Sequence, residues 1–516
     1  MKKKNSDELQ ISEISLEEAR PKKKKRKKAN TAKTAKAVSE EVTDRKERNK
    51  ELVKVSYFFV CVFLSLVGYL IYFNLYQAEA INSNSYNAKQ DSKESQVVRG
   101  SILSSDGQIL AGTNVEVDGS EKRLYPFEHI FAHVVGYSTN GKAGVEATAN
   151  FELMSSHASI LKQVKEEDPD AKVRGDSIVL TQDSRLQKVC YDALGAYDGA
   201  IVVLEPKTGK ILAMVSKPDF NPNTISEDWE ILVNDTENSS LFNRAVQGQY
   251  PPGSTFKILT TLAYLRLHPG DYMDYRYDCP GSISKDGVTI NCYNGAVHGY
   301  EDLEASFVHS CNGSFASIGM DLNNQEFKNL CESFLFNTDL PIDMPSSKSL
   351  FLLPSDASYG EEMMTAIGQG DTVASPLEMA LIAATVANGG NMMKPYYLDR
   401  IETYDHELVK QYKPSVYKEL MTTKEAEILT GFMEKTVTEG TASGLSGLNY
   451  TVAGKTGSAE YEAKGDTKET HSWFVGFSNV SDPDIVVAVI AENGGSGSST
   501  AVPIAKIIFD AYHNGY

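Results

Sequence analysis

Apolar and polar positions divide the chain into a short first part and a long second part, separated by one continuous apolar run. The run covers residues 55–78 and contains no charged side chain. A helix rises about 1.5 Å per residue, so this run is long enough to cross the hydrocarbon core of a bilayer, about 30 Å thick. Tyrosines lie near both of its ends, as in an interfacial belt. The pattern predicts a transmembrane helix over 55–78.

The part before this run, residues 1–54, is basic, with 18 Lys and Arg against 10 Asp and Glu. The positive-inside rule places it in the cytoplasm and the rest of the chain outside the cell membrane. Ala78-Glu79-Ala80 is similar to a signal-peptide cleavage site, but the long preceding segment favours an uncleaved, single-pass anchor. The Lys-rich run 21–28 is typical of a nucleic-acid patch or of a disordered tail near anionic lipid. Its place beside a membrane helix favours the second interpretation, so residues 1–54 are expected to form a disordered cytoplasmic tail, and no nucleic-acid partner is expected.

After the anchor, the pattern predicts a stalk and a small α+β module over 79–180, and a larger unit over 181–516. In the larger unit, β-branched runs lie near both ends and helical patterns lie between them. We expect strands at 200–204, 210–216, 450–458, 472–478 and 484–491, and helices at 375–389, 424–438 and 501–513. This order predicts an α+β domain in which one sheet, built from both ends of the unit, is covered by helices.

The composition is that of a globular protein, with 41% apolar and 23% charged residues. The chain has no glycine-rich phosphate loop, no HExxH and no GxSxG. Nucleotide and zincin chemistries therefore have no support, and no cofactor is expected. Its six cysteines form no CxxC pair and no metal-ligand spacing, so no metal is expected either. The spacing leaves open whether Cys279 and Cys292 form a disulfide outside the cell.

Candidate chemistry begins at Ser254. The residues before it, Tyr250-Pro251-Pro252-Gly253, break the chain, and an apolar helical run follows over 258–265. Ser254 is therefore expected at a helix N-terminus, where free N–H groups favour developing negative charge. Lys257 lies on the same helical face, and burial there would lower its pKa and make it a general base beside a nucleophile. The S-x-x-K pattern occurs four times in the chain, and only this context selects Ser254.

Two further short motifs follow in the chain. Ser310-Cys311-Asn312 offers a hydroxyl that relays a proton and a carboxamide that holds an amide. Lys455-Thr456-Gly457-Ser458 runs along an expected strand, where a lysine and a threonine can face a carboxylate. A second copy, Lys207-Thr208-Gly209, lies in an expected hairpin turn and is interpreted as structural. Each motif alone is weak evidence for function. The three in the order S-x-x-K, S-x-N and K-T-G are together strong evidence.

Together these motifs resemble those of the penicillin-binding proteins. Arg99-Gly100-Ser101-Ile102 and the stretches 366–370 and 471–477 are also similar to that family. One anchor, a short non-catalytic module and one transpeptidase domain resemble the class B members, in particular the short penicillin-binding protein A type. The resemblance implies an antiparallel sheet covered by helices plus an all-helical lobe, preceded by a small dimerisation-type module and one transmembrane helix.

The resemblance also implies an enzyme that cross-links peptidoglycan stem peptides as a serine-type D-Ala-D-Ala transpeptidase. Ser254 would attack the carbonyl between the two D-alanines, and Lys257 would take its proton. Ser310 would pass a proton to the leaving D-alanine, and Asn312 would hold Lys257 and a substrate amide. An amine of a neighbouring stem would then take the acyl group.

Substrate binding is implied for the third motif. Lys455 and Thr456 would bind the terminal carboxylate beside Gly457, and the backbone N–H groups of Ser254 and Ser458 would form the oxyanion hole. The family usually has threonine where this chain has Ser458, and the hydroxyl is kept. The resemblance further implies covalent binding of β-lactams, a SEDS-type glycosyltransferase as partner, and a role in bacterial cell division or cell shape.

Two alternatives remain at this point. A D,D-carboxypeptidase or a β-lactamase would use the same serine with water as acceptor. A membrane receptor that senses β-lactams would form the acyl-enzyme without turnover, but residues 1–54 are too polar for a folded signalling domain.

Overall fold

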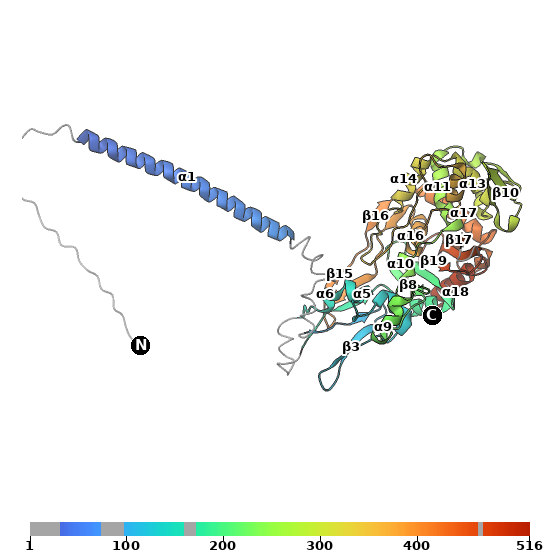
Figure 1. Ribbon diagram of the computed structural model, residues 1–516, viewed down its shortest axis with the longest axis horizontal. Coiled ribbons are helices and arrows are strands. Elements are labelled where there is room, and N and C mark those ends of the chain that lie inside the picture. The colour runs from blue at the N-terminus through green and yellow to red at the C-terminus, as the bar shows by residue number, and fades with distance from the viewer. Residues whose placement is uncertain (1–30, 74–96, 159–171, 463–467) are drawn as a thin grey trace, which may run out of the picture. The chain divides into compact units, whose positions relative to one another are not determined.

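A computed structural model describes residues 31–73, 97–158, 172–462 and 468–516, which fall into two compact units. The first unit contains one helix, α1 (Thr31–Tyr72), shown in Figure 1. Its part Glu41–Tyr72 is long and apolar enough to cross a membrane. The expected anchor residues 74–78 and the basic residues 1–30 lie outside the described part of the chain.

The predicted disorder of residues 1–54 is wrong for 31–54, because α1 begins at Thr31. This stretch is rich in alanine, lysine and glutamate, which are good helix formers. Charged pairs one turn apart support it: Arg45 lies 3.9 Å from Glu41, and Lys54 lies 2.7 Å from Glu51.

The second unit, from Val97 onward, begins with a small α+β module. Its helical pieces are short: η2 (Glu128–Phe131), α4 (Ala132–Val135), α5 (Gly144–Thr148) and α6 (Asn150–Leu153). Its strands are β1 (Val97–Val98), β2 (Ile102–Leu103), β3 (Ile109–Val115), β4 (Glu121–Leu124), β5 (Val173–Arg174) and β6 (Ser177–Leu180). The buried carboxylate of Glu146 joins two of its parts, lying 2.5 Å from Arg99 and 2.7 Å from Arg123.

The sheet of this module is completed by residues from far along the chain. Its strand order is β15-β14-β6-β2-β3-β4, with β14 (Leu398–Glu402) antiparallel to β6 and β15 (Leu408–Gln411) at the edge. Residues on the two sides of the expected boundary at 180/181 therefore pair in one sheet, and the described residues from Val97 onward form one compact unit.

The larger sheet has five strands in the order β17-β18-β19-β7-β8, and every pair is antiparallel. The strands are β7 (Gly199–Leu204), β8 (Ile211–Lys217), β17 (Val452–Glu462), β18 (Lys468–Ser478) and β19 (Val486–Ala491). Each lies where the sequence predicts a strand, and the sheet is built from both ends of the unit. The predicted α+β class with a helix-covered antiparallel sheet is confirmed.

Helices cover both faces of this sheet because its strands are apolar on both sides. Ile201 and Val203 pack with α8 (Ser184–Leu194) and α18 (Ala501–Asn514) on one face. Ala200 and Val202 share the core of the other face. There α16 (Pro376–Ala387) crosses the sheet, with Ser375 as its N-cap and a proline in its first turn, as predicted.

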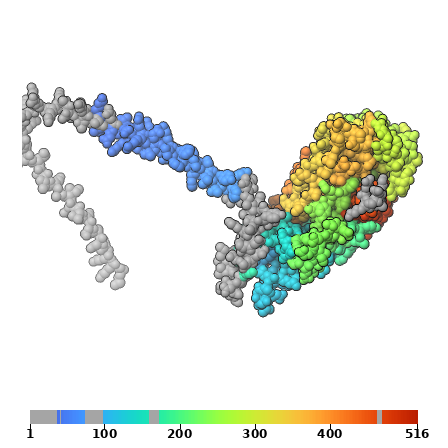
Figure 2. All heavy atoms as spheres, in the orientation of Figure 1, coloured from blue at the N-terminus to red at the C-terminus, as the bar shows by residue number. Residues whose placement is uncertain are grey.

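A mostly helical lobe lies at the end of the unit opposite the small module (Figures 1 and 2). It contains α11 (Lys257–Leu267), α12 (Leu303–Val308), α13 (Asn312–Asp321), α14 (Asn324–Ser333) and α15 (Tyr359–Ala366), and α17 (Thr423–Thr438) packs on it. Its small strands are β9 (Tyr277–Cys279), β10 (Ser282–Lys285), β11 (Val288–Asn291) and β12 (Gly299–Glu301). Short elements complete the unit: α9 (Ile225–Asn234), α10 (Arg244–Gln247), η3 (Gly253–Phe256), η4 (Tyr272–Asp274), η5 (Tyr293–Gly295), β13 (Asn391–Met393), β16 (Val416–Glu419) and η6 (Ser443–Leu445).

Candidate active site

Ser254 lies in η3, the 3-10 turn that leads directly into α11. The turn is held in place by Gly253, whose φ of +54° is a conformation that favours glycine. A Cβ at Gly253 would lie 3.1 Å from the Ser458 carbonyl oxygen, so η3 packs closely against β17. Phe256 anchors the other side of the turn in a cluster of phenylalanine rings. Ser254 itself is half-buried.

Lys257 is the first residue of α11 and is completely buried. Its Nζ lies 2.8 Å from the Ser310 carbonyl oxygen, 2.8 Å from Asn312 Oδ1 and 3.3 Å from Ser310 Oγ. Burial lowers the pKa of Lys257 to about 8. The predicted lysine is therefore in contact with the second motif, and its neutral form is accessible close to neutral pH.

Ser310 lies between two lysines. Its Oγ accepts from Lys455 Nζ at 2.9 Å as well as from Lys257 Nζ at 3.3 Å. Ser310 has a φ of +59°, which is uncommon for a residue with a side chain. Backbone conformations of this kind concentrate at functional sites, because the surrounding structure must hold them in place.

The third motif lies in the middle of β17. Lys455 is fully buried, and its pKa is well below the usual range because of burial and then because of the charge of Lys257. Thr456 Oγ1 lies 2.6 Å from Thr441 Oγ1, and Ser458 Oγ accepts from the Gly497 N–H at 3.2 Å. A Cβ at Gly457 would lie only 3.0 Å from the Pro252 carbonyl oxygen, so glycine permits the close packing of η3 on the strand.

The eight predicted residues lie on adjoining segments: Ser254 is on η3, Lys257 begins α11, Ser310 precedes α13, Asn312 begins α13, and 455–458 lie on β17. Hydrogen bonds link Lys257 to Ser310 and Asn312, and Lys455 to Ser310. The other three S-x-x-K matches are elsewhere. Ser282 and Lys285 are the two ends of β10, Ser415 directly precedes β16, which contains Lys418, and the match at 159–162 lies outside the described residues. The copy at 207–209 is the turn between β7 and β8, where Gly209 has a φ of +79°. This position in a hairpin turn agrees with the structural interpretation of Lys207-Thr208-Gly209.

The sequence did not single out several residues that surround the site. Thr441, on the loop after α17, has no motif and is brought to Thr456 by tertiary packing alone. The buried carboxylate of Glu301 lies 2.6 Å from His309 Nδ1, directly before the second motif. Cys279, Cys292, Cys311 and His298 bring their ligand atoms within 4.8 Å of one another, although their spacings match no known metal pattern. All described cysteines are free thiols, so Cys279 and Cys292 are not bonded.

Comparison with known families gives two matches. The family described as "Penicillin binding protein transpeptidase domain" matches residues 199–510, and "Penicillin binding protein A dimerisation domain" matches residues 99–178. Among curated relatives, the peptidoglycan D,D-transpeptidase PbpA of Mycolicibacterium smegmatis is 28% identical over 89% of this chain and 98% of its own length. The MrdA transpeptidase of Acinetobacter baumannii is 30% identical over 77% of this chain and 66% of its own.

Solved structures agree with these matches. The D,D-transpeptidase domain of a peptidoglycan glycosyltransferase from Eggerthella lenta has a TM-score of 0.72 and 30% identity, covering 81% of this chain and 98% of that one. The penicillin G acyl-enzyme complex of penicillin-binding protein A from M. tuberculosis has a TM-score of 0.72 and 28% identity, covering 80% and 99%. The resemblance stated from the motifs is thus confirmed. The chain belongs to the penicillin-binding protein transpeptidase family: it is a D,D-transpeptidase that also contains the dimerisation domain of penicillin-binding protein A.

Proposed function

We propose that this protein is a membrane-anchored enzyme that cross-links peptidoglycan stem peptides through an acyl-enzyme on Ser254. The observation that carries this proposal is the position of Lys257, buried and in contact with both Ser310 and Asn312. The relatives named as peptidoglycan D,D-transpeptidases and the β-lactam acyl-enzyme structures of a family member support the substrate class and the covalent step.

In the acylation step, Ser254 Oγ attacks the carbonyl carbon between the two D-alanines, and its proton moves to the neutral Nζ of Lys257. Neutral Nζ has two N–H bonds and one lone pair. The two acceptors at 2.8 Å, Ser310 O and Asn312 Oδ1, match the two N–H bonds, which leaves the lone pair for the incoming proton. Asn312 is therefore assigned a positioning role through Lys257.

Ser310 is assigned the transfer of the proton to the leaving D-alanine nitrogen, because its hydroxyl contacts both lysine nitrogens. Two cations flanking one hydroxyl are unfavourable, so a proton moves readily from this pair to the leaving amine. The same positive charge suits an anionic ligand, and we assign Lys455 and Thr456 to the terminal carboxylate of the substrate. Backbone N–H groups of Ser254 and Ser458 are assigned to the oxyanion.

Transfer to an amine distinguishes a transpeptidase from a hydrolase with the same serine. The test is to incubate the full chain in detergent with uncross-linked glycan that carries D-Ala-D-Ala stems, and to measure the products by mass spectrometry. We expect cross-linked stem dimers with the wild type and none with Ser254→Ala. Stems that lose D-alanine without any dimer would identify a D,D-carboxypeptidase and contradict the proposal.

We propose that α1 anchors the enzyme as a single-pass protein, with its N-terminal side in the cytoplasm and the catalytic unit outside. The length and apolar surface of Glu41–Tyr72 and the basic residues before it support this assignment. A SEDS-type glycosyltransferase is the proposed partner, contacting the anchor and the small module. Unchanged capture of such a partner from membranes after deletion of residues 1–180 would contradict this contact.

A further inference from the structure

Three cysteines and a histidine with no part in the proposed reaction meet beside the second motif. The Sγ atom of Cys279 lies 3.6 Å from Sγ of Cys292 and 3.5 Å from Nδ1 of His298. The Sγ atom of Cys292 lies 3.8 Å from Sγ of Cys311. All four ligand atoms are within 4.8 Å of one another, and the three cysteines are buried.

These distances match the edges of a tetrahedral zinc site. With Zn–S bonds of about 2.3 Å and a Zn–N bond of about 2.0 Å, tetrahedral geometry puts neighbouring sulfurs about 3.8 Å apart and sulfur and nitrogen about 3.5 Å apart. A disulfide requires sulfurs about 2.05 Å apart, and the described cysteines are all free. The ligand set of three cysteines and one histidine is one that structural zinc sites use.

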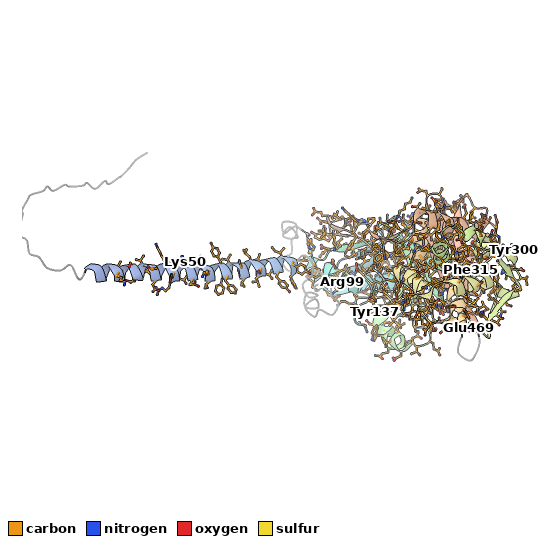
Figure 3. The ribbon with its side chains drawn as sticks, turned by 90° about the horizontal axis from the view of Figure 1, so that it is seen from above. Lys50, Arg99, Tyr137, Tyr300, Phe315 and Glu469 are labelled. Carbon is orange, nitrogen blue, oxygen red and sulfur yellow. The ribbon has the colours of Figure 1, made fainter. Side chains whose placement is uncertain are left out.

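The four side chains come from four different segments of the lobe. Cys279 ends β9, Cys292 follows β11, His298 precedes β12, and Cys311 is the N-cap of α13. Figure 3 shows this part of the lobe near the labels of Tyr300, on β12, and Phe315, on α13. A single ion would therefore join both small two-stranded sheets to the helix that begins at Asn312.

These strands reach the main core through Ile290 on β11 and the partly buried Ile283 on β10, and the region around the cysteines forms a cluster of its own. Its separate hydrophobic cluster consists of the three cysteines, with Tyr277 partly buried against them. Two-stranded hairpins are marginally stable unless something else holds them. A bound structural metal supplies folding free energy directly. Thiolates that coordinate it would therefore join the strands and the helix more strongly than the packing of the thiols alone.

The groups around the cluster fit the second shell of a metal site. The Ser314 N–H points at Cys311 Sγ at 3.4 Å, as a donor to a thiolate would. The His298 ring stacks on His309, with ring centroids 6.0 Å apart and planes 2° apart, and His309 in turn contacts Glu301. These contacts hold the imidazole in the orientation that aims Nδ1 at the three sulfurs.

We propose that Cys279, Cys292, His298 and Cys311 bind Zn²⁺ and that the ion fixes the loop that carries Ser310 and Asn312. Binding forms three Zn–S bonds and one Zn–N bond, releases the three thiol protons to solvent and leaves the imidazole neutral. All four positions are filled by protein, so the ion is structural. Its effect on the reaction is through position: Cys311 lies between Ser310 and Asn312, and Asn312 Nδ2 donates to the Asn291 carbonyl at 2.9 Å, next to Cys292.

The first test is the metal content of the full chain, purified in detergent from zinc-supplemented cells and measured by elemental mass spectrometry. We expect about one zinc per chain in the wild type, and a loss of that zinc in Cys279→Ser and His298→Gln. The matched control is Cys190→Ser, which changes an equally buried cysteine on α8, outside the cluster, and keeps the zinc. Wild-type protein with no more zinc than Cys279→Ser would overturn the proposal.

A second test needs no substitution and so does not depend on how the variants fold. Wild-type protein treated with a chelator is expected to show a lower Tm and slower acylation by fluorescent penicillin, and added Zn²⁺ is expected to restore both. Refilling with Co²⁺ should give the intense visible bands of tetrahedral thiolate coordination. An unchanged Tm after metal removal, or a disulfide between two of the three cysteines in folded, active protein, would overturn the proposal.

Discussion

At the scale of the residue, the proposed role of Lys257 as the general base predicts a pH dependence of acylation. Burial lowers the pKa of Lys257 to about 8, and the form proposed to accept the proton is the neutral one. The acylation rate constant with penicillin should therefore rise about tenfold per pH unit below about pH 8 and level off above it. Stopped-flow measurements with a fluorescent penicillin check this profile.

Lys257→Arg is the control for this profile, because arginine stays protonated throughout the range and should remove most of the acylation at every pH. A wild-type rate that is constant from neutral to mildly alkaline pH would contradict the role of Lys257 as base. If the acylation rate rose only near pH 10, where an ordinary lysine loses its proton, the lowered pKa of the buried Lys257 would be contradicted.

Ser310 combines a hydroxyl with a proposed proton-relay role and an unusual backbone conformation, and two substitutions separate the two features. Ser310→Ala removes the hydroxyl that contacts both lysines, and Ser310→Gly also relieves the φ of +59°. If the hydroxyl relays the proton, both variants should lose about 10²–10⁴-fold in cross-linking rate. Near-normal activity in Ser310→Gly would show that the position needs only its backbone conformation.

At the scale of the element, the turn that carries Ser254 depends on a glycine in another loop. Gly368 has a φ of +72°, and a Cβ there would lie 2.2 Å from the Gly253 carbonyl oxygen. Gly368→Ala should displace η3, lower stability by about 1–3 kcal/mol and slow acylation. Thermal unfolding and penicillin acylation measure the two effects.

Gly431→Ala is the matched control, because no atom lies within 4 Å of the added Cβ in the middle of α17. This substitution should stabilise the protein by about 0.5–1 kcal/mol and leave acylation unchanged. Equal effects of the two substitutions would contradict the argument from close packing.

The elements that the sequence predicted best are those with strong local signals. The helix expected at 375–389 is α16, which has its cap and its first-turn proline where predicted. The strand expected at 450–458 extends to Glu462, because its polar end is held by pairing with β18 rather than by its own apolar pattern. Strands β9 to β12 are short, and no local pattern of apolar residues predicted them.

At the scale of the whole molecule, the limits of sequence analysis are contacts between distant segments. The motifs predicted the candidate site residues, but the approach of Lys455 to Ser310 and of Thr441 to Thr456 depends on tertiary packing. The pairing of β14 with β6 across more than 200 residues is likewise invisible in local patterns. Local periodicity therefore predicts helices and strands, whereas the contacts between distant helices and strands depend on the complete fold.

The pairing of β14 with β6 predicts that the catalytic part does not fold well alone. All four residues of β6 are buried, and removing them leaves β14 as an unpaired edge. We expect a protein of residues 181–516 to have a lower Tm and a stronger tendency to aggregate than one of residues 97–516. Equal Tm values and equal acylation rates would contradict the description of these residues as one compact unit.

The central claim is that Ser254 is the nucleophile of a penicillin-binding transpeptidase. The most direct measurement is the intact mass of the full chain after treatment with penicillin, beside Ser254→Ala. We expect a mass increase of one drug molecule that persists for many minutes in the wild type and does not form in Ser254→Ala. An adduct that persists in Ser254→Ala would contradict the assignment of the nucleophile, and one that clears within seconds would identify a β-lactamase instead.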